Sequence, residues 1–478
     1  ELDPDNKEYA VASGLQRLGP LRKNAGNQEV ASSRNEVLTE MTNVVGSGML
    51  GVTLGCARCH DHKFDPIRHK DYYRIQAYFA AVYDKDIITA TPEQEAEWKE
   101  KKSAHDKQMG ELKKQMKGMK GDDRAKMQAK LAQLEEAAPE PLPSLFSVRN
   151  DMSKASPVHV LARGEYQNKG DRVLPRPLGV LLPDGTPELP ADAKHPRTEL
   201  AKWVTDPANP LTPRVMVNRM WHYHFGRGIV STPNDFGRMG MRPSHPELLD
   251  YLAAEFVSNG WRMKPIHKLM VTSKAYKQAS VSPLEKVANE KDPENALLWR
   301  APIRRLDAEQ LRDAMLAVGG RLNAKAGGPS IIVPVDQELV NLLYKPSQWA
   351  VTKDIAEHDR RSIYLLHKRN LRLPMMEVFD APDMQISCAR REASTHAPQA
   401  LELLNGTLSN DMAKALASRL DKEAGASQPK QVDLAYRIAA GRLPNAQEKA
   451  IALRFLKNQS LTEFALAMLN LNSFLYVN

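Results

Sequence analysis

Cysteine and long apolar stretches are scarce in this sequence. The 478 residues contain three cysteines, Cys56, Cys59 and Cys388, too few for the disulfide framework of a small secreted domain. No apolar run reaches the roughly 20 residues that a membrane-spanning helix needs. The first ten residues, ELDPDNKEYA, contain neither the basic stretch nor the apolar core of a signal peptide. We therefore expect a globular chain with no membrane span of its own.

Several recognition motifs are also missing. Basic residues outnumber acidic ones by 67 to 58, but they form no compact patch interleaved with aromatic residues, so a nucleic-acid partner is not expected. The glycines of GGRLNAKAGG lack the spacing of a nucleotide-binding loop, and no G-x-S-x-G nucleophile turn occurs. The net charge of +9 fits an acidic redox partner, an anionic polysaccharide or an anionic surface, and equally a basic protein whose charge only keeps it soluble.

Helical periodicity dominates the chain. Apolar residues recur at helix spacing from Arg34 to Val45, from about Lys70 to Phe79, and over most of the sequence after His195. Residues 92–137 are rich in Glu, Lys, Gln, Ala and Met, with a break at Gly118 to Gly121. This composition predicts two helices folded into an arm, which is either a partner-docking element or a solvated insertion.

The expected fold is mainly α, with one small β element near residues 155–190. Two β-like runs, PVHVLARGEY and DRVLPRPLGVLL, flank a turn at Asn168-Lys169-Gly170. SIIVPV and RSIYLLH, between residues 328 and 370, are shorter strand-like pieces. Changes in composition divide the chain into residues 1–90, 91–144, 145–194 and 195–478.

The segment Cys56-Ala57-Arg58-Cys59-His60 carries the clearest chemistry. Cys-x-x-Cys-His is the attachment signature of a c-type haem. Two thiols three residues apart can form thioethers to the two vinyl groups of one porphyrin, and His60 then supplies the proximal nitrogen ligand to the iron. The motif predicts one covalent haem c, bound through Cys56 and Cys59, in a redox protein of an exported compartment.

Three other uses of these residues remain open. The cysteines could form a redox-active dithiol, although no thioredoxin-like βαβ pattern surrounds them. With His60 and His62 they could form half of a zinc site, although the sequence has no second cysteine pair. They could also be joined in a plain disulfide bond.

The sequence around the motif resembles the planctomycete cytochrome-c-like domain family. GVTLGCARCHDHKFDPI and the following KDYYRIQAYF are similar to the C-terminal part of that domain. In this family, a second domain of unknown function usually follows the cytochrome-c-like domain. Five downstream segments resemble that second domain: VMVNRMWHYHFGRGIVSTPNDFG, APIRRLDAEQLRDA, RRSIYLLHKRN, FDAPDMQISCARREASTHAPQALELLNG and the ending ALAMLNLNSFLYVN. His396, in STHAPQAL, and His69, after Pro66-Ile67, depart from the family pattern.

The resemblance implies a c-type haem segment followed by a larger helical domain. It assigns residues 1–90 to the C-terminal part of the cytochrome-c-like domain and 195–478 to the mainly helical companion domain. Between them, composition predicts a helical arm and Pro-rich linker over 91–144 and a small β segment over 145–194. Members of the family are typically longer at the N-terminus. We therefore expect a longer precursor whose export signal has been removed, and a periplasmic or otherwise exported location. The role of the family is unsettled, so the resemblance implies a haem and a location rather than a reaction.

An electron-transfer haem needs a second axial ligand, usually Met or His. Met41 and Met49 precede the motif closely enough to fold back over it, and their alternative role is to fill the core. His62 is two residues past His60, so we expect it to line the haem pocket rather than reach the opposite face. Without a sixth ligand, the open iron would be able to activate peroxide or another small molecule.

A second group of polar residues falls in the downstream segments. Asn and Arg donate several hydrogen bonds and Trp stacks on the apolar faces of sugars, so the group is a candidate carbohydrate site. Its alternative role is a structural network in which Asp307 and Asp313 pair with the arginines. The candidates are Asn218, Arg219, Trp221, Asp235, Arg304 and Arg305.

Three functions are compatible with these features. The first, which we favour, is an exported c-type haem protein that transfers electrons to a redox partner protein or to other cytochrome subunits. The second is a structural or interaction subunit of a larger cytochrome complex, with the arm as its docking element. The third is a haem-dependent redox enzyme acting on a carbohydrate-type or small-molecule substrate.

Overall fold

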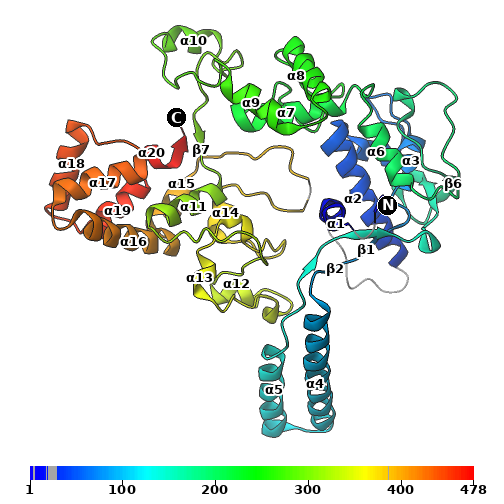
Figure 1. Ribbon diagram of the computed structural model, residues 1–478, viewed down its shortest axis with the longest axis horizontal. Helices are drawn as coiled ribbons and strands as arrows, with labels where there is room; N and C mark the ends of the chain where they lie inside the picture. The colour runs from blue at the N-terminus through cyan, green and yellow to red at the C-terminus, as the bar shows by residue number, and fades with distance from the viewer. Residues whose placement is uncertain (4–5, 18, 20–29, 386, 478) are drawn as a thin grey trace. The chain divides into compact units, whose positions relative to one another are not determined.

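The computed structural model describes residues 1–3, 6–17, 19, 30–385 and 387–477 (Figure 1). About 53% of the chain is helical, and the strands of the described residues form four two-stranded antiparallel pairs. The expected mainly α fold is therefore confirmed. Within the same ranges, no helix combines the length and the apolar character that crossing a membrane requires.

The chain forms two compact units. The first consists of residues 1–41 and 70–202, and the second of residues 42–69 and 203–478. The boundary at residues 41 and 42 falls within helix α2 (Val30–Val45). The Cys-x-x-Cys-His motif therefore belongs to the unit that contains the downstream helices.

The first unit combines helices with three strand pairs, and the arm and the pair β5–β6 are described separately below. Its buried aromatic residues Tyr72, Tyr73 and Tyr78 are at most 1% exposed, and the buried Gln76 donates a hydrogen bond to Thr39 at 3.2 Å. Its elements are α1 (Lys7–Ser13), η1 (Gly14–Arg17), α3 (His69–Ala77), β1 (Val82–Asp84) paired with β4 (Val148–Asn150), β2 (Ile87–Ile88) paired with β3 (Ser144–Leu145), η4 (Met152–Lys154), η5 (Ala162–Gly164), η6 (Gly179–Leu181) and α6 (Pro196–Val204).

The expected β element is the antiparallel pair of β5 (Val158–Leu161) and β6 (Lys169–Val173), in which Val158 lies opposite Val173. The second β-like run was expected to extend through residue 182. The strand ends at Val173 instead, and residues 179–181 form a turn of 3-10 helix.

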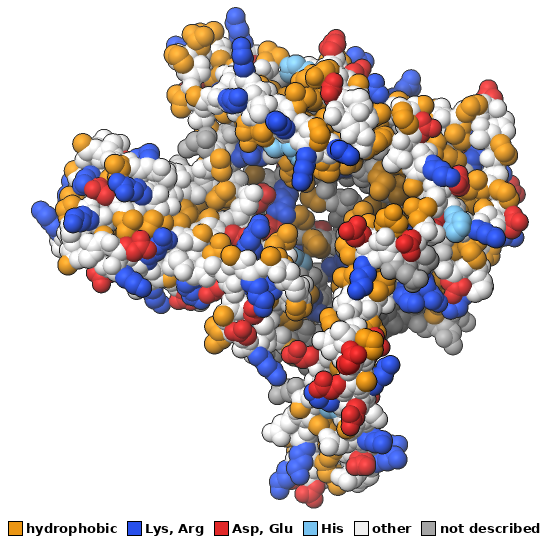
Figure 2. Space-filling view, viewed as in Figure 1, with side chains coloured by type: hydrophobic (Ala, Val, Ile, Leu, Met, Phe, Trp, Pro, Cys, Tyr) orange, Lys and Arg blue, Asp and Glu red, His pale blue; other side chains and the backbone are white. Residues whose placement is uncertain are grey.

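The predicted arm is a hairpin of α4 (Pro92–Met116) and α5 (Gly121–Glu136). No residue of α4 is buried, and Figure 2 shows side chains of both charges interspersed along the arm. Two hydrogen bonds brace it, from Trp98 to the Glu140 carbonyl and between His105 and the Leu134 carbonyl, both 2.8 Å long. The break expected at residues 118–121 is where the chain reverses.

Three helices follow the boundary of the second unit at residue 203. A helix with an apolar stripe must bury that stripe against a neighbour, and here Val217 and Met220 of the first helix pack with Leu252 and Phe256 of the second and Ile266 of the third. These helices are α7 (Thr212–Phe225), α8 (Pro246–Ser258) and α9 (Met263–Thr272).

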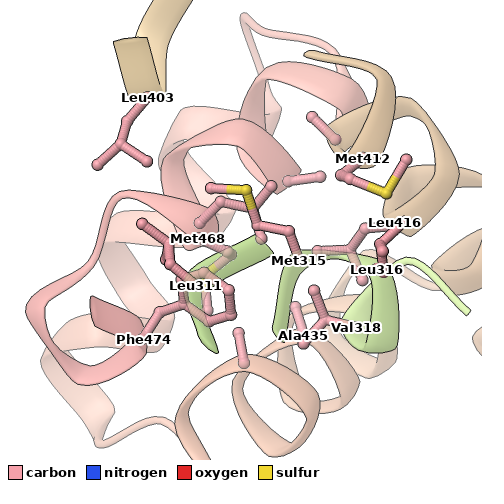
Figure 3. Packing of buried hydrophobic residues seen from close by; sticks show 14 of the residues in the cluster. Leu311, Met315, Leu316, Val318, Leu403, Met412, Leu416, Ala435, Met468 and Phe474 are labelled. Atoms are coloured by element: carbon pink, nitrogen blue, oxygen red, sulfur yellow. The ribbon is translucent and has the colours of Figure 1, made fainter. Parts of the chain in front are cut away.

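A second core of this unit is formed mainly by α11 and α14–α20 (Figure 3). Leu311 and Met315 contribute to it together with Met412, Leu416 and Met468, all at most 2% exposed. The elements after α9 are α10 (Glu285–Lys291), α11 (Ala308–Val318), α12 (Gln337–Asn341), η7 (Pro346–Gln348), α13 (Ile355–His358), η8 (Ser362–Tyr364), α14 (Pro374–Val378), α15 (Ala397–Asn405), α16 (Thr407–Ala424), α17 (Gln428–Ala440), α18 (Ala446–Leu456), α19 (Leu461–Leu469), α20 (Asn472–Leu475), and the pair β7 (Arg304–Arg305) with β8 (Tyr476–Val477).

The strand-like pieces expected between residues 328 and 370 are not strands. Ile331 pairs with Leu365 in an isolated parallel bridge, and both side chains are buried in the helical core. Their apolar sequence therefore reflects burial against helices rather than pairing in a sheet.

Replacing Leu416 by Ala should destabilise the second unit by about 2–5 kcal/mol, because truncating a fully buried leucine removes apolar contacts and leaves a cavity. Leu401→Ala is the matched control, since this side chain is 57% exposed and its loss should change stability by less than about 0.5 kcal/mol. Equilibrium urea unfolding followed by circular dichroism measures both. Equal midpoints for the two variants would contradict the burial of Leu416 in the core.

Candidate functional site

The Cys-x-x-Cys-His motif lies in a loop at the surface of the second unit. We call residues 51–69 the motif loop. It follows a π-helical turn, η2 (Gly46–Leu50), and contains a 3-10 turn, η3 (Leu54–Arg58), that bears Cys56. Ala57 between the cysteines is buried, whereas both thiols are exposed and are not joined to each other. The turn therefore presents both sulfurs on the outside while its apolar residues anchor it.

His60 is exposed and its ring is oriented by the backbone. Its Nδ1 lies 2.6 Å from the carbonyl oxygen of Asp61. A carbonyl can only accept, so Nδ1 carries the proton and donates it. The lone pair of a neutral His60 is therefore on Nε2, and a backbone carbonyl bound to the other ring nitrogen is the usual support of a metal-ligating histidine.

His62 has the opposite arrangement. Its ring is buried, and Nδ1 accepts hydrogen bonds from the backbone N–H groups of Asp65 at 2.9 Å and Phe64 at 3.3 Å. Nε2 therefore carries the proton and donates to Thr53 Oγ1 at 3.0 Å. Because both ring nitrogens are occupied, His62 closes the motif loop and has no lone pair free for a ligand.

The buried carboxylate of Asp65 connects the motif loop to a downstream loop. Its Oδ1 accepts a hydrogen bond from the backbone N–H of Arg238 at 2.8 Å. Gly237, the residue before Arg238, lies so close to the Asp65 carboxylate that a Cβ on Gly237 would overlap the carboxylate oxygens. The motif loop is thus held by residues about 170 positions further along the chain.

A second connection lies at the start of the motif loop. The carbonyl of Gly51 accepts a hydrogen bond from the Phe236 N–H at 2.7 Å. The backbone of Gly51 has φ +61°, and a Cβ there would lie 2.7 Å from Val215 Cγ2 and 2.8 Å from the Phe236 ring. Glycine is therefore required at this position both by conformation and by space.

The two methionine candidates lie in different surroundings. Met41 is buried in α2 and belongs to the first compact unit, whereas Met49 is half-buried in η2, in the same unit as the motif. His69, which departs from the family pattern, starts α3 and lies 3.0 Å through Nε2 from the Arg58 carbonyl. Its backbone N–H donates to Asp61 at 2.7 Å, so this histidine also takes part in the structure of the loop.

The six downstream candidates do not form one site. Asn218 is fully buried, and its amide pairs with both the N–H and the carbonyl of Val230, at 2.8 and 2.9 Å. Arg219 donates to the carbonyl of Ser47 at 3.1 Å and also bonds Asn234, and its burial lowers the pKa of the guanidinium. These two residues maintain the packing of α7.

The other four candidates are dispersed. Trp221 stacks on Phe225 with ring centroids 3.9 Å apart, and it lines a cavity together with Arg304. Asp235 accepts a hydrogen bond from the Gly237 N–H at 2.9 Å within its own turn. The carboxylate partner of Arg305 is Asp380, at 2.7 Å.

The arginine partners suggested by the sequence were therefore wrong. Asp313 lies within ion-pair distance of Arg312 and Arg361, and Asp307 lies 3.8 Å from Arg391. Neither carboxylate pairs with Arg304 or Arg305 in the described part of the chain.

Two histidines of α7 are perturbed by their surroundings. Burial lowers the pKa of His222, and the nearby positive charges of Arg390, Arg304 and Arg219 lower it further. Burial also lowers the pKa of His224, whose Nε2 lies 2.8 Å from Nδ1 of His267. No three His, Cys, Asp or Glu side chains of the described ranges are close enough together to hold a metal ion.

The downstream half of the chain identifies its family. Residues 196–456, more than half of the chain, match the model of PSD1, a protein of unknown function (DUF1553). The chain belongs to the PSD1 family. Residues 1–84 match the model of PSCyt2, also a protein of unknown function (DUF1549). Neither a curated protein nor a solved structure matches the chain.

These matches confirm the resemblance at the level of two planctomycete-associated domain families of unknown function. In this PSD1-family chain, the hydrogen bonds at Gly51 and Asp65 link the PSCyt2 match to the start of the PSD1 match.

Sequence reasoning missed the residues that hold the motif loop. Thr53, Asp65 and Arg238 were not singled out, because their partners are a histidine side chain and backbone groups. The spacing His62-x-x-Asp65 was a usable signal, since a side chain three residues before a backbone N–H can accept from it in a tight turn. The bond to Arg238 had no signal in the sequence.

Replacing Gly51 by Ala should destabilise the second unit by about 2–4 kcal/mol, since the new Cβ adds left-handed backbone strain to a steric overlap. Gly48→Ala is the matched control. Gly48 lies three residues earlier, and the nearest atom to its Cβ position is Val44 Cγ1 at 4.0 Å. Urea unfolding of both variants tests the prediction, and a Gly51→Ala variant as stable as Gly48→Ala would contradict the packing at this position.

Proposed function

We propose that this PSD1-family protein is an exported c-type haem protein that transfers electrons. The observation that carries the proposal is the state of the motif side chains. Two exposed thiols, not linked to each other, stand beside an exposed imidazole whose Nε2 lone pair is free. This is the donor set that one covalent haem c requires.

The residues present fit that group. Cys56 and Cys59 would hold the porphyrin through thioether bonds, and His60 Nε2 would ligate the iron, with its Nδ1–H kept on the Asp61 carbonyl. When bound, the haem supplies reversible one-electron exchange at its iron. The hydrogen bond from His60 to a carbonyl also makes the imidazole a stronger donor to the metal.

The rest of the loop supports this role by its rigidity. His62 and Asp65 immobilise the chain directly after His60 through bonds within the loop and to residue 238. These bonds would hold His60 in a constant position beside Cys56 and Cys59. The exposure of the motif favours a haem near the surface, within reach of a redox partner protein or of other cytochrome subunits.

The alternative haem-dependent enzyme acting on carbohydrate has less support. Its expected site required Asn218, Arg305 and Trp221 to converge on one ligand. The amide of Asn218 is fully occupied by Val230, and Arg305 is paired with Asp380. We therefore place electron transfer first, with a periplasmic or otherwise exported location as part of the same proposal.

A pyridine haemochrome assay of the purified protein should show one c-type haem per chain that acidified acetone does not extract. Cys56→Ser and Cys59→Ser should each lose a thioether and shift the reduced α-band, and the double variant should lose all covalent haem. Cys388→Ser is the control, because Cys388 is also an exposed free thiol and its loss should leave the spectrum unchanged. A colourless wild-type protein, or zinc bound to the motif cysteines, would refute the proposal.

The two neighbouring histidines should have separable effects. His60→Ala should retain the covalent haem but change the native absorption spectrum and the midpoint potential, because the iron loses its proximal ligand. His62→Ala should retain the native spectrum and lower the stability of the protein by about 1–3 kcal/mol, because Thr53 and the Asp65 N–H lose their buried partner. Spectroelectrochemistry and urea unfolding measure the two effects. The reverse result, a spectral change in His62→Ala alone, would overturn the roles of both histidines.

A further inference from the structure

A cavity of about 320 Å³ lies in the second unit, and no residue of the motif loop lines it. Its wall is formed by the turn after α7, by residues 241–245 and by the loop after α10. Ligand pockets of drug-sized molecules begin at about this volume, so the cavity is large enough for a single sugar ring with one substituent. Trp221 and Phe225, stacked on each other, form an apolar part of the wall.

The loop after α10 is organised by its own side chains. The Asp292 carboxylate accepts hydrogen bonds from the backbone N–H groups of Ala296 at 2.9 Å and Leu297 at 2.8 Å. The Asn295 amide donates to the Arg300 carbonyl at 2.9 Å and accepts from its N–H at 3.3 Å. These bonds hold the loop in a defined conformation and place Arg300 in the cavity wall.

The same loop contains unfavourable backbone geometry. Asn295 and Leu298 have φ angles of +53° and +56°. Asparagine tolerates this region, but a leucine adopts it only where the surrounding contacts require it. Backbone strain of this kind is concentrated at ligand-binding and catalytic sites, and here both residues line the cavity.

The charge of the cavity is strongly positive. Four arginines line it against one glutamate, and that glutamate, Glu294, is already paired with Arg227. The other three, Arg242, Arg300 and Arg304, have no carboxylate within ion-pair distance among the described residues. Arg300 also has a buried Nε that lacks a hydrogen-bond partner. Arg242 and Arg304 are exposed, so their guanidinium groups are available to an anionic acceptor in the cavity.

We propose that this cavity binds a sugar-sized molecule that bears an oxyanion, such as a carboxylate, sulfate or phosphate group. Arg300 and Arg242 bind the anionic group, because guanidinium groups bond planar and tetrahedral oxyanions through two parallel N–H groups. Arg304, which donates to the Tyr223 carbonyl at 2.8 Å, adds positive charge from a fixed position. Trp221 and Phe225, only 8% and 4% exposed, supply an apolar floor under the ring of the ligand. This site does not depend on the proposed haem.

Calorimetric titration of the full chain at constant ionic strength tests the site. The probes are D-glucuronate, D-glucose 6-sulfate and D-glucose 6-phosphate, with D-glucose as the uncharged control. We expect saturable binding of at least one of the three anions, and binding of D-glucose at least tenfold weaker. The tightest of the three probes identifies the anionic group for which the cavity is built.

Two variants locate the binding. Arg300→Gln and Arg242→Gln should each lower the affinity for the anion at least tenfold. Arg242 is exposed, so its variant should fold even if Arg300→Gln disturbs the stacking on Trp299. Arg454→Gln is the charge-matched control, since Arg454 is exposed on α18, outside the cavity. The proposal is overturned if no anion binds, if D-glucose binds equally well, or if Arg454→Gln weakens binding as much as the cavity variants.

Discussion

The candidate site depends on one buried imidazole. His62 accepts hydrogen bonds from the N–H groups of residues 64 and 65 and donates to Thr53, so both edges of its ring are used to close the motif loop. A buried ring nitrogen with an unmet hydrogen bond would cost about 1–3 kcal/mol, roughly twice what the bond itself contributes. This requirement favours the observed path of the chain around Cys56 and Cys59, in which the side chain of His60 is exposed.

The loop closed by His62 is completed by a different part of the chain. The Asp65 carboxylate accepts a hydrogen bond from the backbone N–H of Arg238, and the Gly51 carbonyl accepts one from the N–H of Phe236. Arg219 on α7 donates a hydrogen bond to the carbonyl of Ser47, just before the motif loop. These bonds connect the two family segments within one compact unit. In the proposed electron-transfer role, such a connection would keep His60 in place while partners bind and leave.

Positive charge is distributed unevenly over this unit. Some arginines form ion pairs that organise the packing of loops. Arg305 pairs with Asp380, and Arg391 pairs with Glu309. The arginines of the cavity after α7 are different, since three of them have no carboxylate partner in the described ranges. The modest net charge of the whole chain conceals this local excess, because the charges elsewhere nearly cancel.

The sequence by itself determined the mainly α fold and the two-helix arm at residues 92–137, and it singled out Cys56, Cys59 and His60 as the haem-attachment candidate, because each depends on spacing along a short segment. It left the downstream candidates open between a ligand site and a structural network. Tertiary packing supplied partners for Asn218 and Arg305, namely Val230 and Asp380. Only the tertiary structure decided which polar groups were satisfied and which, like Arg300 Nε and His60 Nε2, have no hydrogen-bond partner among the described residues, because hydrogen-bond partners distant in sequence leave no local pattern.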